Sequence, residues 1–190
     1  MNGKYNPLIF IAGIHGVGKT TLCLSLANTI GVECLDASKL IADQKKLLCM
    51  CEIDSGKDAN DMHSNQHLLI EAITQRQKEK KWYLLTGHFS LINSSNTIQA
   101  LPIYVFEAIR PAQVILLVDT VEDISRRIFT RDNVQYDTAL LAEMQEIERR
   151  QARIVADKLG ISVCEAKPDE ITKLVAVVKR TISEYGEISS

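Results

Sequence analysis

Short apolar runs alternate with longer amphipathic stretches along almost the whole chain. The apolar runs occupy residues 8–14, 32–35, 82–86, 113–118 and 161–164, and their length and β-branched content predict strands. They are apolar at consecutive positions, which is typical of parallel strands covered on both faces. The pattern therefore predicts an α/β fold in which a parallel sheet lies between two layers of helices.

The segments between these runs have helical character. Helices are expected over residues 19–27, 37–51, 64–78, 102–109, 121–131 and 138–159, and a last helix is expected to open at 168–170. Residues 52–62 are polar and rich in turn formers, so we expect them to be mobile, and the last residues are expected to fray. No internal repeat or linker divides the sequence, which predicts a single domain over residues 1–190.

The composition is that of an ordinary globular protein. Of the 190 residues, 46% are hydrophobic and 24% are charged, and a chain of this length buries roughly 70% of its unfolded surface. The net charge of −2 argues against nucleic-acid binding through bulk positive charge, and the lysines at 78–81 are interpreted as a solvated corner. No apolar run approaches the roughly 20 residues of a membrane helix, so no membrane partner is expected.

The cysteines are odd in number and no export signal accompanies them. The five are Cys23, Cys34, Cys49, Cys51 and Cys164. Such usage predicts reduced thiols and a cytoplasmic location. Cys49 and Cys51 could also form a metal site with His63 and His67, but the C-x-C spacing and the lack of a second cysteine pair favour ordinary thiols.

A glycine-rich motif follows the first predicted strand and opens the first predicted helix. Gly13-Ile-His-Gly-Val-Gly-Lys19-Thr20 matches the phosphate-loop pattern G-x-x-x-x-G-K-[ST] in full. Glycines let successive backbone N–H groups surround a phosphate, and the helix N-terminus adds unpaired donors and a positive dipole end. Lys19 is expected to reach the β- and γ-phosphates and Thr20 to bind Mg²⁺. The predicted ligands are ATP and Mg²⁺, and the candidate binding residues are Gly13, Ile14, His15, Gly16, Val17, Gly18, Lys19, Thr20 and Thr21.

Further pieces match a known family in order along the chain. They are Leu85-Thr-Gly-His-Phe89, the Leu101-Pro pair, Pro111 followed by Val114-Ile-Leu-Leu-Val, Arg126-Arg127 with Arg131, and Glu148-Arg149-Arg150. With the phosphate loop, they make residues 8–164 resemble the small P-loop nucleoside monophosphate kinases, archaeal-type adenylate kinases and related small kinase-like ATP-binding proteins above all. The resemblance implies a three-layer α/β/α P-loop NTP hydrolase fold with a five-stranded parallel sheet of order 2-3-1-4-5. It also implies an acceptor-binding helical segment at 37–81 and a small lid at about 127–137.

Three arginines are candidate catalytic residues beside Lys19. Phosphoryl transfer needs positive charge on the migrating group, and Arg127 and Arg131 lie on the same side of a helix because they are four positions apart. By resemblance these two correspond to lid arginines that bind donor phosphates, and Arg150 corresponds to an arginine that contacts the transferred phosphate. The alternative is a set of surface ion pairs, since acids precede Arg126, Arg127 and Arg150 by four positions.

Polar residues at the ends of two predicted strands are candidates for acceptor binding. Asp36 ends the second strand, where it could contact an acceptor hydroxyl or a magnesium-bound water, or simply cap a helix. His88 follows the third strand and could contact the acceptor or orient a water; an ordinary hydrogen-bonded histidine is the alternative. The resembling kinases often carry an acid where this chain has Thr86. Magnesium would then rely on Thr20, phosphate oxygens and waters, with Asp36 or Asp119 further out.

These features predict an ATP- and Mg²⁺-dependent phosphotransferase. The resemblance implies a small acceptor, above all a nucleoside monophosphate, and a subsidiary version uses a nucleoside or another small alcohol with Asp36 as base. The alternative is a nucleotide-responsive ATP-binding or ATPase accessory protein with little kinase activity, and Thr86 in place of an acid favours it slightly. The expected partners are a nucleotide and a small-molecule acceptor, and a protein partner is left open.

Overall fold

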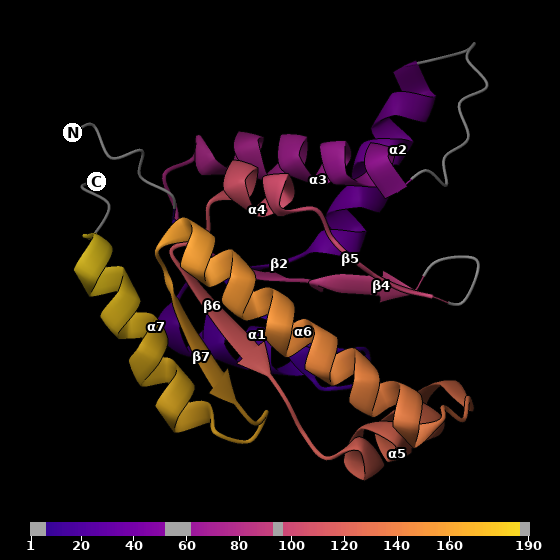
Figure 1. The fold of residues 1–190 in the computed structure, drawn as a ribbon. Coiled ribbons are helices and arrows are strands. Elements are labelled where there is room, and N and C mark those ends of the chain that lie inside the picture. Colours follow the sequence, from indigo (N-terminus) through magenta and orange to yellow (C-terminus); the bar gives the residue numbers. More distant parts are fainter. Residues whose placement is uncertain (1–6, 52–61, 93–96, 187–190) are drawn as a thin grey trace.

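The computed structural model describes residues 7–51, 62–92 and 97–186, which form strands and helices in alternation (Figure 1). In chain order the elements are β1 (Leu8–Ala12), α1 (Lys19–Ile30), β2 (Glu33–Asp36), α2 (Ala37–Cys51), α3 (Met62–Gln77), β3 (Tyr83–Thr86), β4 (Ser90–Ile92), β5 (Ile98–Ala100), α4 (Ile103–Ile109), β6 (Gln113–Leu117), α5 (Val121–Asp132), α6 (Thr138–Leu159), β7 (Ser162–Ala166) and α7 (Ile171–Tyr185).

Within the described residues, five parallel strands form the main sheet in the order β2-β3-β1-β6-β7. When only the strands of the main sheet are numbered, β6 and β7 become the fourth and fifth strands, and the order is the 2-3-1-4-5 expected from the family resemblance. The three-layer α/β/α fold class is confirmed. Because all five strands run the same way, their carboxyl ends meet at one edge. The phosphate loop leaves that edge from β1, and the segments after β2, β3 and β6 leave it on either side.

Alternate residues of the central strand pack against opposite helical layers. Ile9 and Ile11 belong to a core cluster that includes residues of α1, α5 and α7, whereas Phe10 belongs to a second cluster with residues of α3, α4 and α6. Figure 1 shows α6 crossing one face of the sheet while α1 lies behind the other. β1, β3 and β6 are buried at every position, as their continuous apolar sequences predict.

The two outer strands are less buried than their apolar sequences suggested. β2 and β7 are each covered on one side only by a neighbouring strand, and most of their residues keep partial or full exposure. Several helix boundaries also differ by a few residues from the expected ones. α1 continues to Ile30, where Gly31 with φ 80° ends it by donating its N–H to the Ala27 carbonyl.

The antiparallel pair β4-β5 was not predicted from the sequence. Each strand has three residues, and they pair as Ser90 with Ala100 and Ile92 with Ile98. A signal existed, because two short runs flank the turn-forming residues at 93–96. The pair projects from the carboxyl edge beside α6 (Figure 1), so it extends the wall of the region where the phosphate loop lies.

One expectation about the cysteines is wrong. The structure joins Cys23 of α1 to Cys34 of β2 by a disulfide, with their Cα atoms 5.9 Å apart. Both side chains face the same core cluster, because the chain turns at Gly31 and brings β2 back along α1. Among the cysteine side chains that the structure describes, Cys164 is a free thiol.

Some expectations concern residues that the structure does not describe. The stretch 52–61 and the end 187–190 lie outside it, and so do the side chains of Cys49, Cys51 and His63, so the metal alternative remains a prediction. Within the described residues, no helix combines the length and apolar character needed to cross a membrane.

Candidate active site

The phosphate loop adopts a conformation that requires glycine. Gly16 has φ 78°, and a Cβ at this position would lie 2.4 Å from Cγ1 of Ile128 on α5. Gly13 has φ 144°, and its Cβ would lie 2.6 Å from the carbonyl oxygen of Leu117 at the end of β6. The loop is thus held between β6 and α5, and its backbone remains open where the N-terminus of α1 begins.

A polar cavity of about 420 Å³ lies over this loop, and we call it the phosphate cavity. Its lining residues come from the loop and the start of α1, from the end of β2 and the start of α2, from α5 and from the segment after β3. They are His15, Gly16, Gly18, Lys19, Thr20, Thr21, Asp36, Ser38, His88, Arg127 and Arg131. The cavity therefore collects most of the residues that the sequence singled out. Gly13, Ile14 and Val17 are not among its lining residues, and the last two bury their side chains in the core.

The Lys19 ammonium group is held by three acceptors. Nζ donates to the carbonyl oxygens of Gly13 at 2.7 Å and Ile14 at 3.1 Å, and it lies 3.2 Å from Nε2 of His88. Burial lowers the pKa of Lys19 to about 8, with Glu148 and Asp36 opposing the shift and Arg131 adding to it. The charge is thus poorly solvated before any phosphate binds, and a phosphate oxygen would relieve that cost.

The depressed pKa of Lys19 predicts how ATP affinity depends on pH. Bound phosphate favours the ammonium form, so above about pH 8 binding must be accompanied by proton uptake. We expect the Kd for ATP to level off as the pH falls toward 7, to be about doubled near pH 8, and to rise by up to about tenfold per pH unit above that. Isothermal titration calorimetry in buffers of different ionisation enthalpy measures both effects. Lys19→Arg should bind with no rise between pH 8 and 9.5, and an equal rise in that variant would contradict the assignment.

His88 is neutral and acts as an acceptor toward Lys19. Burial, followed by the charges of Lys19 and His15, lowers the pKa of His88 to about 3. Since an ammonium group only donates, Nε2 of His88 accepts and Nδ1 carries the ring proton. The hydrogen bond to Lys19 agrees with the alternative that His88 is an ordinary hydrogen-bonded histidine. His88 also lines the phosphate cavity.

Glu148 holds the segment that carries His88, and sequence reasoning missed it. Its carboxylate accepts from the backbone N–H groups of Phe89 and Ser90 at 2.8 and 2.7 Å and from the Ser90 hydroxyl at 2.8 Å. The side chain is 1% exposed, and burial raises its pKa while these donors and Lys19 oppose the rise. Glu148 therefore links α6 to the residues beside the phosphate loop.

Asp36 ends β2 and lies beside Thr86, the residue that stands where the resembling kinases often carry an acid. β2 and β3 pair in register Asp36 to Thr86, and the Thr86 hydroxyl donates to Oδ2 of Asp36 at 3.0 Å. Oδ1 accepts from the backbone N–H of Lys39 at 3.0 Å, so Asp36 also caps α2. Asp36 therefore caps α2, as one interpretation of the sequence held, and it also lines the phosphate cavity. Its contact with an acceptor or with a magnesium-bound water stays a prediction. The carboxylate comes from β2, and Thr86 orients it.

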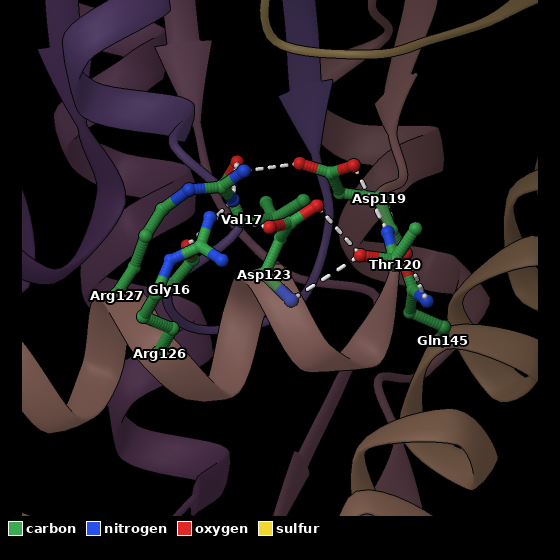
Figure 2. A network of polar contacts seen from close by, with 8 residues as sticks. All are labelled: Gly16, Val17, Asp119, Thr120, Asp123, Arg126, Arg127 and Gln145. Atoms are coloured by element: carbon green, nitrogen blue, oxygen red, sulfur yellow. Dashed lines mark hydrogen bonds and ion pairs between the residues drawn. The ribbon is translucent and has the colours of Figure 1, made fainter.

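Arg127 connects α5 to the phosphate loop. Figure 2 shows its guanidinium group between the loop and Asp119, an arrangement drawn from three elements. Nη1 donates to the carbonyl oxygens of Gly16 at 3.4 Å and Val17 at 3.3 Å, and Nη2 pairs with the Asp119 carboxylate. Its neighbour Arg126 instead pairs with Asp123 on the surface of α5 (Figure 2). Arg127 therefore contacts the phosphate loop and Asp119, rather than Asp123 as the surface alternative would have it.

The remaining candidate arginines differ in position. Arg131 lines the phosphate cavity, contacts the ring of His15 and forms an ion pair with Asp132. The hydrogen bond from Arg131 lowers the pKa of Asp132 to about 2. Arg150 is exposed on α6 and is not among the residues that line the phosphate cavity. The cause is helical geometry: two positions correspond to roughly 200° of rotation, so the face that buries Glu148 turns Arg150 away. The structure therefore does not bring Arg150 to the other catalytic candidates.

A second cavity, of about 240 Å³, adjoins the first, and we call it the apolar cavity. It lies between α2, α3, α4 and the segment after β3, and its walls include Phe10, Leu69 and Phe106. Ser38 and His88 line both cavities, so the two are in contact at these side chains. α2 and α3 belong to the segment 37–81 that the sequence analysis expected to bind the acceptor.

The oxygen atoms around Thr20 fit a magnesium ion better than a softer metal. Thr20 and Asp36 both line the phosphate cavity, and hydroxyl and carboxylate oxygens are ligands that Mg²⁺ accepts. No group of three or more His, Cys, Asp or Glu side chains among the described residues could hold a metal on its own. Such a site suits an ion that keeps several waters and arrives with substrate phosphates.

Comparison with protein families agrees with this arrangement. Residues 12–148 match the family model AAA_17, described as an AAA domain, and the matched region contains the phosphate loop, Asp36, His88, Arg127 and Glu148. The chain belongs to this AAA domain family. A search of curated proteins finds no match to the sequence.

Solved structures similar to this chain include several small kinases. Shikimate kinase from Acinetobacter baumannii, in complex with shikimate, matches with a TM-score of 0.59 and 19% identity over 97% of each chain. A sugar kinase from Janibacter sp. HTCC2649 gives 0.57 and 16% over 95% of this chain and 98% of that one. A gluconokinase from Sinorhizobium meliloti 1021 gives 0.54 and 12% over 96% and 95%. These matches establish the P-loop kinase fold, and they do not single out the adenylate kinases.

Proposed function

We propose that the protein is an ATP- and Mg²⁺-dependent phosphotransferase that moves the γ-phosphoryl group of ATP to a small acceptor. The observation that carries this proposal is the convergence of Lys19, Arg127 and Asp36 on one cavity over a complete phosphate loop. Two cations and one carboxylate match what transfer requires, since the protein must neutralise the migrating group and hold the attacking oxygen.

Each residue has a role that follows from its position. The loop amides and the N-terminus of α1 bind the phosphates, Lys19 neutralises the β- and γ-phosphates, and Thr20 together with Asp36 would hold the magnesium ion or its waters. The ion, when bound, supplies charge neutralisation on the phosphate oxygens. Asp36 keeps unused lone pairs on both carboxylate oxygens, so it can also accept a proton from an acceptor hydroxyl.

The lid and acceptor regions complete the proposal. We place the lid at the end of α5 and the residues up to 137, where closure would bring Arg131 onto the donor phosphates and exclude water. We place acceptor binding in the segment 37–81, whose helices line the apolar cavity. A nucleoside monophosphate is the acceptor implied by the resemblance to adenylate kinases. The similar structures instead include enzymes named for shikimate, gluconate and a sugar.

A single product assay tests the proposed function. The protein is incubated with Mg²⁺ and γ-labelled ATP together with each of a panel of monophosphates, nucleosides, sugars and cyclic acids, and products are separated by chromatography. Formation of a labelled product with one acceptor, and faster ATP consumption in its presence, is the expected result. Tight ATP binding without a product from any acceptor would contradict the proposal and support a nucleotide-responsive binding protein.

Replacing Arg127 with alanine should slow transfer more than it weakens ATP binding. Its guanidinium group touches the phosphate loop and faces the cavity, so it would act most on the charge that develops during transfer. We expect kcat to fall by about 10–100-fold, with a smaller change in the Kd for ATP. Arg126→Ala is the matched control, because Arg126 pairs with Asp123 on the surface. Equal losses in both variants, or a loss explained by a lower Tm, would contradict the role of Arg127.

A further inference from the structure

The apolar cavity has walls suited to the body of an organic ring. Phe10 and Phe106 meet edge to face with their centroids 5.5 Å apart, and Leu69 and Val105 also line the space. A cavity of about 150 Å³ encloses benzene, so one of about 240 Å³ has room for a ring with substituents. It is also small compared with the pockets that bind drug-sized ligands.

No described residue that lines this cavity carries a charge. Its polar lining consists of Ser38, Asn65, Gln66 and His88, and the low pKa of His88 keeps that ring neutral at physiological pH. A phosphate or carboxylate placed here would lose its hydration without meeting a cation among the described lining residues, which is a large free-energy cost. The charges of Lys19, Arg127 and Arg131 all line the phosphate cavity instead.

Asn65 lines the apolar cavity and is the candidate partner for a neutral ligand. Its Oδ1 atom is buried and accepts no hydrogen bond from any described residue. Beside it, the Tyr104 hydroxyl donates to Oε1 of Gln66 at 2.6 Å and fixes that carboxamide. An unsatisfied buried acceptor costs about 1–3 kcal/mol, and a ligand hydroxyl or N–H group would satisfy it.

The junction of the two cavities gives such a ligand access to the phosphate loop. Ser38 and His88 belong to both linings, and Nε2 of His88 lies 3.2 Å from Nζ of Lys19. Asp36 lies two residues before Ser38 and lines the phosphate cavity. A hydroxyl on the part of the ligand nearest this junction would therefore lie next to the phosphate cavity, which Asp36 also lines.

We propose that the apolar cavity binds an uncharged, ring-bearing alcohol and that this alcohol is the phosphoryl acceptor. The proposal rests on the proposed phosphotransferase function and names its substrate class. In the step, the alcohol oxygen forms a bond to the γ-phosphorus while the bond from that phosphorus to the β,γ-bridging oxygen breaks. The hydroxyl proton passes to Asp36, ADP leaves, and the products are a phosphate monoester and ADP.

Acceptor pairs that differ only in charge test the proposal. We would compare each common nucleoside with its 5′-monophosphate, and methyl quinate with quinate, as acceptors of label from γ-labelled ATP. We expect transfer to at least one uncharged member, with kcat/KM at least tenfold above that of its anionic counterpart. Efficient transfer to a monophosphate or a carboxylate, with its uncharged counterpart at least tenfold poorer, would overturn this inference and leave the phosphotransferase function intact. Failure of every acceptor would overturn both.

A variant of Asn65 tests the binding mode. Asn65→Leu should raise KM for the preferred alcohol by about three- to tenfold, because one hydrogen bond is lost, and should leave KM for ATP unchanged. Its Tm should not fall, since an unsatisfied polar atom is removed. Gln75→Leu, on the exposed face of the same helix, is the control and should change neither constant. An unchanged KM for the alcohol in Asn65→Leu, or equal changes for ATP and alcohol, would contradict binding at Asn65.

Discussion

Replacing Lys19 with alanine is expected to lower kcat/KM for ATP-dependent transfer by a factor of about 10²–10³. Nζ of Lys19 is held above the phosphate loop by the carbonyls of Gly13 and Ile14, where it can turn to a phosphate oxygen. Its burial keeps water away, so its charge acts on the phosphates in a region of low dielectric. The loss should appear in ATP affinity and in the rate of transfer, measured by calorimetry and by the product assay.

A control separates this effect from general loss of positive charge. Lys158→Ala removes an exposed lysine at the end of α6, near the start of β7 and hence at the opposite edge of the sheet. This variant should behave as the parent protein does. Because the charged form of Lys19 is poorly solvated, Lys19→Ala should keep or raise the Tm of the nucleotide-free protein. Parent-like turnover by Lys19→Ala would contradict the assigned role.

The parts of the site that the sequence predicts are those built from neighbouring residues. The phosphate loop is a local motif, so its glycines, Lys19 and Thr20 were predicted from spacing alone. The strand before it and the helix after it were predicted from the apolar pattern of the chain and are present in the structure. Thr86 shows the limit of this reasoning. It looked like the loss of an acid, but the register of β2 on β3 supplies the carboxylate of Asp36 from the adjacent strand. Such pairing depends on contacts fifty residues apart, which spacing does not reveal.

The long helix α6 shows how a residue that supports the candidate site can be overlooked. Glu148 precedes two arginines, and this polar run was interpreted as carrying Arg150 into the site. The buried positions of α6, however, include Leu141, Met144, Glu148 and Ala152, at intervals of three or four residues. A glutamate at an apolar helical position was a readable signal of a buried carboxylate. Reading it would have pointed to Glu148, whereas the family resemblance pointed to Arg150.

Replacing Glu148 with alanine is expected to have the largest effect on stability. The change leaves three buried donors without their acceptor, namely the N–H groups of Phe89 and Ser90 and the Ser90 hydroxyl. At about 1–3 kcal/mol for each unsatisfied group, and allowing for partial relaxation, the free energy of unfolding should fall by about 3–5 kcal/mol. Urea denaturation followed by circular dichroism measures this change.

Two further variants distinguish a local role of Glu148 from a general effect of charge. Glu146→Ala removes an exposed acid of the same helix that pairs with Arg149, and it should change the free energy of unfolding by less than about 1 kcal/mol. Glu148→Gln keeps one acceptor oxygen and should fall between the parent and Glu148→Ala. His88 directly precedes Phe89 and contacts Lys19, so a shift of the Phe89–Ser90 backbone would also move His88. Glu148→Gln should therefore also lower kcat, measured at a temperature where the variant remains folded. If Glu148→Ala and Glu146→Ala were equally stable, α6 would not hold the segment beside the candidate site through this carboxylate.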